Sequence, residues 1–393
     1  MDLVAIANSP VGHLVPISGM DPWRGELYEH QAFVPAALPR DLGELRLSDE
    51  TWSAVVGAAG ALAKLDQAGR QVPNPELVRR PTLRREAQST SALEGTYAAF
   101  TDVLEADLDV RVTRSAEVRE VLNYVKAAEI AFNWIEDRPL TLGLLGELQG
   151  LLVRDTAGEL SDAGGVRDRQ VVVGQQRGPI TEARFIPPPP GNLLDEGVQA
   201  WLSWVNSTSE MPEVVRAALA HYQFETLHPF SDGNGRLGRL IVVLQLMQYG
   251  VLHYPLLIVS PWFETRRRDY QDQLLAVSET GDFDPWVRFF AEGLRAQAEE
   301  TVRRIVALLD YQEELRTMIR DQNIRGVRAK LMEDIIGQPI VAVTWAQHHY
   351  GVSYQTANEA VARLVRDGIL KEMTGRSYAR LFMADRVLTV VED

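Results

Sequence analysis

From Ser48 onward, apolar residues recur three and four positions apart in one segment after another. This spacing places them on one face of a helix and predicts a mainly α chain. Ser48 begins the first helix, which ends near Gly69 and the two prolines that follow. Further helices are expected at 82–107 (broken at or near Glu94-Gly95), 114–135, 141–155, 193–206, 214–226, 235–249, 270–278 and 285–321.

Two segments depart from this pattern. Residues 1–47 contain five prolines and little periodicity, so we expect an extended arm laid over the body. Residues 170–173 (QVVV) and 183–186 (ARFI) flank a turn rich in Gly, Gln and Pro, which predicts a short β-hairpin over 170–186. The four prolines 187–190 end it, because proline has no N–H to donate to a strand ladder.

Composition limits the class of protein. The 393 residues include no cysteine, which excludes disulfides and thiolate metal sites and fits a reducing cytoplasm. The N-terminus lacks the features of a signal peptide. The most apolar stretch, 240–259, is interrupted by two glutamines, a glycine, a histidine and a proline. We therefore expect a soluble cytoplasmic protein with no membrane span.

The charge is unevenly distributed. The net charge of −14 argues against nonspecific nucleic-acid binding by the whole chain. Residues 321–393 contain nine Lys and Arg and nine Asp and Glu, so the whole excess of negative charge lies in residues 1–320. A neutral tail on an acidic body indicates a separate C-terminal module.

The twelve residues HPFSDGNGRLGR, 228–239, join two of the expected helices. His228 precedes a proline, so it ends the first helix and faces the loop. The glycine-rich loop exposes consecutive N–H groups, and the helix after it adds a positive N-terminus, which together favour a bound anion. Arg236 and Arg239 lie three positions apart on that helix, and their guanidiniums suit phosphate oxygens.

Asp232 in the same loop would repel phosphates unless a cation lay between them. One carboxylate plus substrate phosphates is the usual arrangement around Mg²⁺, so Asp232 predicts a Mg²⁺ ligand. An ordinary histidine has a pKa near neutrality, so His228 can take a proton from an incoming hydroxyl. These residue types together predict transfer of a nucleotide phosphate group.

The stretch resembles the signature of the Fic family (filamentation induced by cAMP), H-x-F-x-[DE]-G-N-G-R-x-x-R, at every fixed position. The resemblance implies a mainly helical core and transfer of AMP from ATP to a Tyr, Thr or Ser hydroxyl of a target protein or of the chain itself, releasing pyrophosphate. It implies that His228 is the general base, that Asp232 binds Mg²⁺ and that the phosphates are held by Gly233, Asn234, Gly235, Arg236 and Arg239.

Two other segments match parts of the same family. The hairpin at 170–186, with Val171, Val172 and Val173, is similar to the family's flap, which docks a target segment by strand addition. STSALEGT, 89–96, resembles the family's inhibitory motif [ST]-x-x-x-E-[GN], filled by Thr90, Glu94 and Gly95. In that subgroup the glutamate pairs with the second arginine, Arg239 here, and removes the partner of the ATP γ-phosphate. A hydrolase that removes AMP would use the same residues, so the direction of the reaction stays open.

A metal site is the competing interpretation of the helix before the signature. His221, Glu225 and His228 have the spacing of a helical carboxylate–histidine site. Such a site needs further carboxylates on partner helices, and no second Glu-x-x-His occurs. We therefore interpret His221 and Glu225 as packing or supporting groups.

The tail resembles a winged helix-turn-helix module, as found behind some Fic cores. Helices 344–350 and 354–366 flank Gly351, and two strands follow. The resemblance implies DNA-groove contacts from Tyr354, Gln355 and Asn358 and wing contacts from Arg376 and Arg380. The small basic excess gives little affinity for phosphates, so protein docking or dimerisation remain alternatives. A nucleotide-sensing DNA-binding regulator is the alternative function, and a homodimer is left open.

The expected fold is therefore mainly α: a Fic-type helical core with a small β-hairpin flap, plus a C-terminal winged-helix-like α+β module. The expected divisions are an N-terminal arm (1–47), a helical region with the inhibitory motif (48–135), the catalytic core (136–300), a connecting helix (301–328) and the C-terminal module (329–393).

Overall fold

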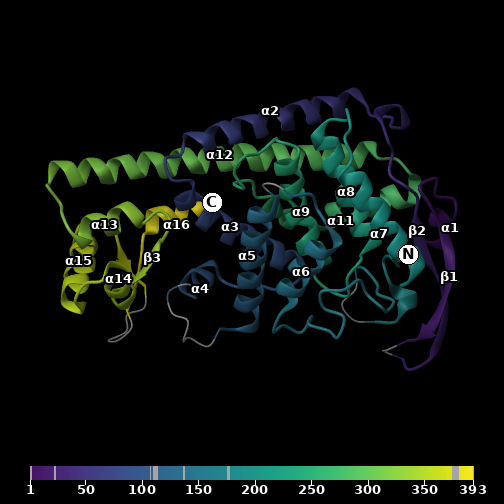
Figure 1. The fold of residues 1–393 in the computed structure, drawn as a ribbon, viewed down its shortest axis with the longest axis horizontal. Helices are drawn as coiled ribbons and strands as arrows, with labels where there is room; N and C mark the ends of the chain where they lie inside the picture. Colours follow the sequence, from purple (N-terminus) through teal and green to yellow (C-terminus); the bar gives the residue numbers. More distant parts are fainter. Residues whose placement is uncertain are drawn as a thin grey trace.

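The computed structural model describes residues 2–21, 24–106, 108, 114–135, 138–174, 178–373 and 380–392. Most of these residues are helical, and the strands form two small antiparallel sheets, which confirms the expected fold class. Figure 1 shows an elongated molecule with one sheet at the right-hand end and the C-terminal module at the left.

Two long helices span the upper side of the molecule. Helix α2 (Asp49–Gln71) and helix α12 (Asp284–Asp321) lie against each other along most of α2 (Figure 1). Their first turns are joined, because the Ser48 N–H donates to Asp284 Oδ1 at 2.6 Å and the Ser48 hydroxyl caps α2 at the Thr51 N–H. The helices are therefore parallel. At 1.5 Å per residue, the 38 residues of α12 reach about 57 Å, from the core to the C-terminal module.

The remaining helices pack below this pair around one continuous hydrophobic core. Helices α8 (Glu213–Leu227) and α9 (Asn234–Gln248) are buried on nearly all sides, which makes them its centre. The helices around them are α3 (Pro75–Leu93), α4 (Phe100–Glu105), α5 (Ala116–Ile135), α6 (Leu142–Val153), α7 (Asn192–Val205), α10 (Ser260–Thr265) and α11 (Arg267–Thr280). The sequence predicted most of these within a few residues, but α10 and the early start of α3 were missed.

The N-terminal segment has regular structure that the sequence did not predict. Helix α1 (Leu3–Ala7) is followed by strands β1 (Gly12–Met20) and β2 (Leu27–Pro35), which pair antiparallel from Gly12↔Pro35 to Met20↔Leu27. The expected extended arm is thus a β-ribbon. Prolines lie at an interior position of β1 and at the end of β2 without preventing pairing, because a ribbon has outer edges where a missing N–H costs little. A short 3₁₀ turn, η1 (Leu42–Glu44), leads into α2.

The segment expected to form a hairpin over 170–186 is less regular. Val173 and Phe185 form one antiparallel bridge, with N–H···O distances of 2.9 and 3.3 Å, and the 3₁₀ turn η2 (Ile180–Glu182) lies between them. Residues 175–177 are outside the described part of the chain. The end of the segment instead packs against the N-terminal ribbon, where the Phe33 N–H of β2 donates to the Ile186 carbonyl at 2.9 Å. The expected strands are therefore reduced to a bridge in the described residues.

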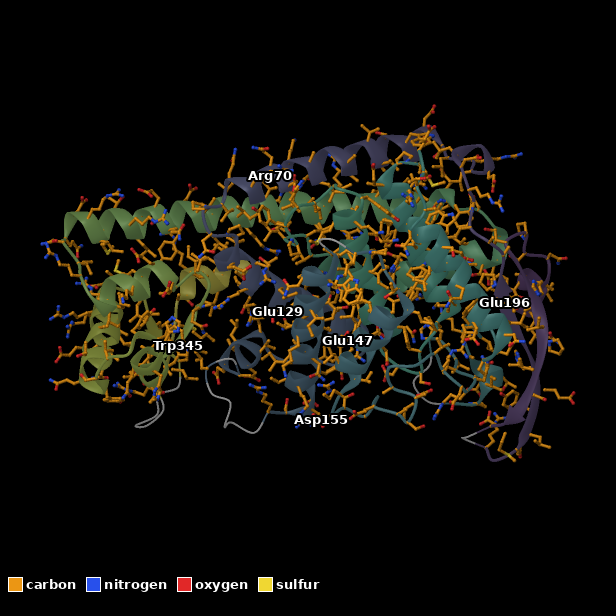
Figure 2. All side chains as sticks on the ribbon, in the orientation of Figure 1. Arg70, Glu129, Glu147, Asp155, Glu196 and Trp345 are labelled. Atoms are coloured by element: carbon orange, nitrogen blue, oxygen red, sulfur yellow. The ribbon has the colours of Figure 1, made fainter. Side chains whose placement is uncertain are left out.

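The C-terminal module follows the order helix, strand, helix, helix, strand, strand. These elements are α13 (Val327–Asp334), β3 (Ile340–Ala342), α14 (Val343–Tyr350), α15 (Tyr354–Arg366), β4 (Lys371–Glu372) and β5 (Leu381–Met383), with sheet order β3-β5-β4. Strand β3 and the last helix, α16 (Asp385–Glu392), were not predicted. Trp345 of α14 lies in this module, and Glu196 of α7 lies towards the ribbon at the other end (Figure 2).

Candidate active site

Helix α8 ends at His228 in an unusual backbone conformation. His228 has φ 48° and ψ 61°, the left-handed region that non-glycine residues seldom adopt. Its N–H still bonds to the Phe224 carbonyl at 2.9 Å, so the chain turns sharply at this residue and continues into Pro229. Backbone strain of this kind is typical of functional loops held by their surroundings.

The ring of His228 is oriented to act as a proton acceptor. Nδ1 lies 3.3 Å from the Glu225 carbonyl oxygen, which can only accept, so Nδ1 is the donor and Nε2 is left with a free lone pair. The pKa of His228 is lowered to about 4, mainly by burial and in smaller part by the positive charge of nearby Arg167. The imidazole is therefore neutral at pH 7.

The loop after His228 is fixed by its own side chains. Asn234 is buried, accepts from the Phe230 N–H at 2.9 Å and donates to the Phe230 carbonyl at 2.7 Å. Gly233 has φ 81° and is the N-cap residue just before α9, so the loop amides lie at the positive end of that helix. The Asn234 amide therefore braces the loop, while the backbone of Gly233 and Gly235 lines the adjacent cavity.

The first signature arginine is shared between two carboxylates. Arg236 is buried, and its Nη2 donates to Asp232 Oδ1 at 2.9 Å. Its Nη1 lies 2.7 Å from Glu120 Oε1 on α5. The Asp232 side chain is 44% exposed, so its carboxylate remains open to the cavity while it contacts Arg236.

The second signature arginine is held by the segment that resembles the inhibitory motif. Arg239 Nε donates to Thr90 Oγ1 at 2.7 Å, and Nη2 donates to the Thr90 carbonyl at 3.1 Å and to Glu94 Oε1 at 2.6 Å. Burial raises the pKa of Glu94, but the charge of Arg239 outweighs it, and the net pKa lies below the ordinary value. Burial lowers the pKa of Arg239, yet Glu94 reverses the shift and raises it overall. Both groups are therefore charged at pH 7.

Gly95 explains how Glu94 comes to lie at the end of α3. Gly95 has φ 97°, and its N–H bonds to the Ala92 carbonyl, while the Thr96 N–H bonds to the Ser91 carbonyl, both at 3.0 Å. This pair of bonds is a Schellman cap, in which a glycine adopts the left-handed conformation just past the helix end. The predicted helix break at Glu94-Gly95 is therefore confirmed, with Glu94 as the last, half-helical residue.

A cavity of about 570 Å³ brings these groups together. Its walls include His228, Asp232, the loop glycines, Arg239 and Glu94. Val172 and Val173 of the flap segment also line it, whereas Val171 does not. A Cβ added to Gly235 would clash with Glu94 Oε1, so the Glu94 carboxylate packs directly against the backbone at the start of α9. Glu94 thus occupies the position where α9 favours an anion.

Arg167 was missed by the sequence reasoning. It is buried between the flap and the loop, where Nε donates to the His228 carbonyl at 2.8 Å, Nη2 to the Pro188 carbonyl at 2.6 Å and Nη1 to the Arg169 carbonyl at 3.0 Å. Burial lowers its pKa to about 10. An arginine in a polar loop gives no sequence signal for this role, because its partners are backbone carbonyls and two of them belong to distant segments.

The alternative metal site is not formed by the described residues. His221 Nε2 bonds to the Tyr270 hydroxyl at 2.8 Å and Nδ1 lies 3.2 Å from the Gly238 carbonyl, so both ring nitrogens are occupied. Burial lowers the pKa of His221 to about 3 and raises that of Glu225 to about 7. Within the described ranges, no cluster of three His, Cys, Asp or Glu could hold a metal ion. The role of His221 and Glu225 as supporting groups stays a prediction, and Glu225 also lines the cavity that contains His228.

Comparison with known proteins identifies the two central parts of the chain. Residues 52–133 match the family model described as Fic/DOC family N-terminal, and residues 139–246 match the one described as Fic/DOC family. The chain carries both domains of the Fic/DOC family. The Fic segment includes His228, the loop and both arginines, and the Fic N-terminal segment includes Thr90, Glu94 and Glu120.

Curated relatives of these Fic domains are named protein adenylyltransferases. The chain is 31% identical over 176 residues to protein adenylyltransferase fic-1 from Caenorhabditis briggsae, covering 44% of this chain and 31% of the relative. It is 33% identical over 177 residues to protein adenylyltransferase Fic from Drosophila grimshawi, covering 44% and 32%. The chain thus spans about a third of the length of these relatives.

Solved Fic structures share the fold. A Fic family protein from Desulfovibrio desulfuricans G20 superposes with a TM-score of 0.56 at 22% identity, covering 86% of this chain and 97% of that one. A fragment of Fic-1 from C. elegans gives a TM-score of 0.51 at 21% identity, covering 64% and 72%. At these identities the likeness concerns the fold alone.

The C-terminal candidates lie apart from the Fic site. Tyr354, Gln355 and Asn358 are on the first turns of α15, where Tyr354 is exposed and the Gln355 amide donates to Glu359 at 3.2 Å. Arg380 lies 3.7 Å from Glu372. Arg376 lies outside the described residues. In the ranges that the structure describes, no helix is both long and apolar enough to cross a membrane.

Proposed function

We propose that the chain is a self-inhibited protein adenylyltransferase, which transfers AMP from ATP to a Tyr, Thr or Ser hydroxyl of a target protein or of itself. The observation that carries this proposal is the shared cavity of His228 and Arg239, in which Glu94 occupies the guanidinium. The names of the curated relatives support the same reaction class.

The reaction follows from the groups that surround the cavity. The hydroxyl oxygen attacks the α-phosphorus of ATP, the new P–O bond forms and the bond to pyrophosphate breaks. His228 Nε2 takes the hydroxyl proton, which its neutral ring can accept. The backbone of residues 233–235 with Arg239, all on the cavity wall, would bind and orient the phosphates, because helix amides and guanidiniums are preorganised for anions. Arg236 does not line the cavity; it contacts Asp232, which does.

Asp232 fits the role of a Mg²⁺ ligand. It is a single, half-exposed carboxylate on the cavity wall, and no second carboxylate is needed when phosphate oxygens complete the coordination. A bound Mg²⁺ would neutralise charge that develops on the phosphates as pyrophosphate leaves. Asp232 Oδ1 accepts a hydrogen bond from Arg236 Nη2 at 2.9 Å, and a carboxylate has further lone pairs for a cation.

Self-inhibition follows from the position of Glu94. A γ-phosphate needs the guanidinium of Arg239, and the Glu94 carboxylate lies 2.6 Å from it. If ATP binds without a contact between its γ-phosphate and Arg239, its α-phosphate is misplaced relative to the incoming hydroxyl. The rate of AMP transfer then falls. The Glu94 side chain is 40% exposed, so it can leave the cavity without unfolding the core.

Intact mass of the purified protein after incubation with ATP and Mg²⁺ tests the proposal. We expect Glu94→Gly to gain one AMP mass and the Glu94→Gly, His228→Ala double variant to gain none. Glu196→Gly, the same change on the exposed face of α7 (Figure 2), is the matched control and should behave like the wild type. The proposal would be contradicted if Glu94→Gly attached AMP neither to itself nor to proteins in an added mixture.

AMP removal is a second candidate for the same site. The position of the Glu94 carboxylate at the cavity wall favours it, because a carboxylate there can orient a water molecule towards an AMP-modified side chain. Incubating an AMP-modified protein with the wild type and with Glu94→Gly separates the two reactions. Release of AMP that requires Glu94 would support the hydrolase.

We further propose that the C-terminal module, with the element order of a winged helix, docks a protein. Its charges are balanced, with nine basic and nine acidic residues in 321–393, which offers little affinity for DNA phosphates. A gel shift with random-sequence DNA at moderate salt is the test. A retained fragment would instead support the DNA-binding regulator.

A further inference from the structure

A second carboxylate, Glu120, contacts the other signature arginine, Arg236. Glu120 lies on α5, where its Oε1 is 2.7 Å from Arg236 Nη1 and accepts from the Thr96 hydroxyl at 3.0 Å. The other side of the same guanidinium contacts Asp232. A continuous polar chain therefore runs from Thr96 through Glu120 and Arg236 to Asp232.

Thr96 belongs to the turn that places Glu94. Its N–H completes the cap of α3 by bonding to the Ser91 carbonyl, and its hydroxyl bonds to Glu120. The backbone of Thr96 thus bonds to α3 and its side chain bonds to α5. The turn 94–96 is therefore tied to α5, and Glu94 cannot shift with that turn unless the bond to Glu120 breaks.

We propose that Glu120 is a positioning residue that couples the turn 94–96 to Arg236, so that each of the two signature arginines is restrained by a carboxylate linked to this turn. This inference rests on the proposed function. Glu94 pairs with Arg239 directly. Glu120 contacts both Thr96 of the turn 94–96 and Arg236, and so holds them in the positions they have in the inhibited state. Release of inhibition then requires the Thr96–Glu120 bond to open together with the Glu94–Arg239 pair.

The burial of Glu120 and Arg236 makes this coupling strong enough to measure. The side chain of Glu120 is 17% exposed and that of Arg236 is 3% exposed, so water competes poorly for their contact. Burial raises the pKa of Glu120, and the charge of Arg236 opposes this shift. The partly buried Glu120 carboxylate accepts a hydrogen bond from the Thr96 hydroxyl, and removing that donor leaves the carboxylate charge less well satisfied.

Substitution of Thr96 tests the coupling without touching either arginine. Thr96→Val removes the hydroxyl but preserves the shape of the side chain. We expect about a fivefold rise in AMP transfer by intact mass, and a similar gain in ATP affinity by calorimetry, the effect of one lost hydrogen bond. Thr96→Ser, which keeps the hydroxyl, should restore wild-type values. Thr101→Val, the same change in the next helix, is the matched control.

The background of the measurement distinguishes this inference from the proposed function. In Glu94→Gly protein, Thr96→Val should add less than twofold, because the inhibitory carboxylate is already absent. An equal gain in both backgrounds, or none in wild type, would overturn the coupling while leaving AMP transfer by Glu94→Gly intact. If Glu94→Gly itself transfers no AMP, the proposed function fails instead. Calorimetry of ATP binding still reports the coupling in that case.

Discussion

Glu94 Oε1 lies 2.6 Å from Arg239 Nη2, and this pair joins the end of α3 to the first turns of α9 across 145 positions of sequence. Thr90, one turn earlier on α3, holds the same guanidinium through its hydroxyl and its carbonyl. The end of one helix therefore binds the arginine that the proposed function assigns to the nucleotide phosphates. The following predictions test the parts of this arrangement separately.

Gly95→Ala should loosen inhibition without removing the carboxylate. At φ 97° a Cβ is strained, so the cap of α3 opens and Glu94 is displaced. We expect AMP transfer to rise, with a stability loss of about 1 kcal/mol in thermal unfolding. Gly368→Ala, at φ 72° in the C-terminal module, should lose similar stability but leave transfer unchanged. Equal transfer by both variants would contradict this account.

His228 should remain neutral well below pH 6.5. Because burial lowers its pKa to about 4, ¹³C-histidine NMR should show no titration of this ring between pH 5.5 and 8. Below pH 6.5 the unfolded chain binds the proton first, so this histidine lowers stability progressively as the pH falls towards 4. His228→Ala, which also identifies the signal, should lack that part of the decline. A step near pH 6.5 that disappears in His228→Ala would refute the prediction.

Arg167→Met should destabilise the fold and slow the reaction together. The substitution leaves the carbonyls of His228, Pro188 and Arg169 without their donor inside the protein. We expect a loss of about 3 kcal/mol in denaturant unfolding, since each unsatisfied buried group costs about 1–3 kcal/mol. Arg169→Met removes a half-exposed guanidinium beside it and should cost less than about 1 kcal/mol. Equal losses in the two variants would show that Arg167 has no special role.

Asp232→Asn should separate metal binding from loop structure. In Glu94→Gly protein we expect AMP transfer to fall by about 100-fold or more, and ATP affinity measured by calorimetry to lose its dependence on Mg²⁺. Asp162→Asn is the control. Asp162 accepts a hydrogen bond at 2.6 Å from the hydroxyl of Ser231, the neighbour of Asp232 in the loop, but Asp162 does not line the cavity. Retained Mg²⁺ dependence in Asp232→Asn would exclude the assigned ligand.

Much of the site could be predicted because its parts are local. Apolar spacing located α5 to α9, the His228-Pro229 pair marked the end of α8, and Gly95 marked the end of α3. Each of these depends on backbone geometry within a few residues. The N-terminal ribbon was missed, because pairing of strands that contain proline depends on where their edges lie. The flap hairpin was overestimated, because its Ile186 carbonyl accepts from β2.

The sequence by itself determined the helical fold class, the caps and the residue types of the loop between α8 and α9, since periodicity, glycine and proline act over a single turn. Only the tertiary structure decided that Glu120 meets Arg236, that Arg167 braces His228 and that Glu94 rests on Gly235. Those contacts join segments far apart in the chain. Their partners are set by how the helices pack, and no local pattern records that packing.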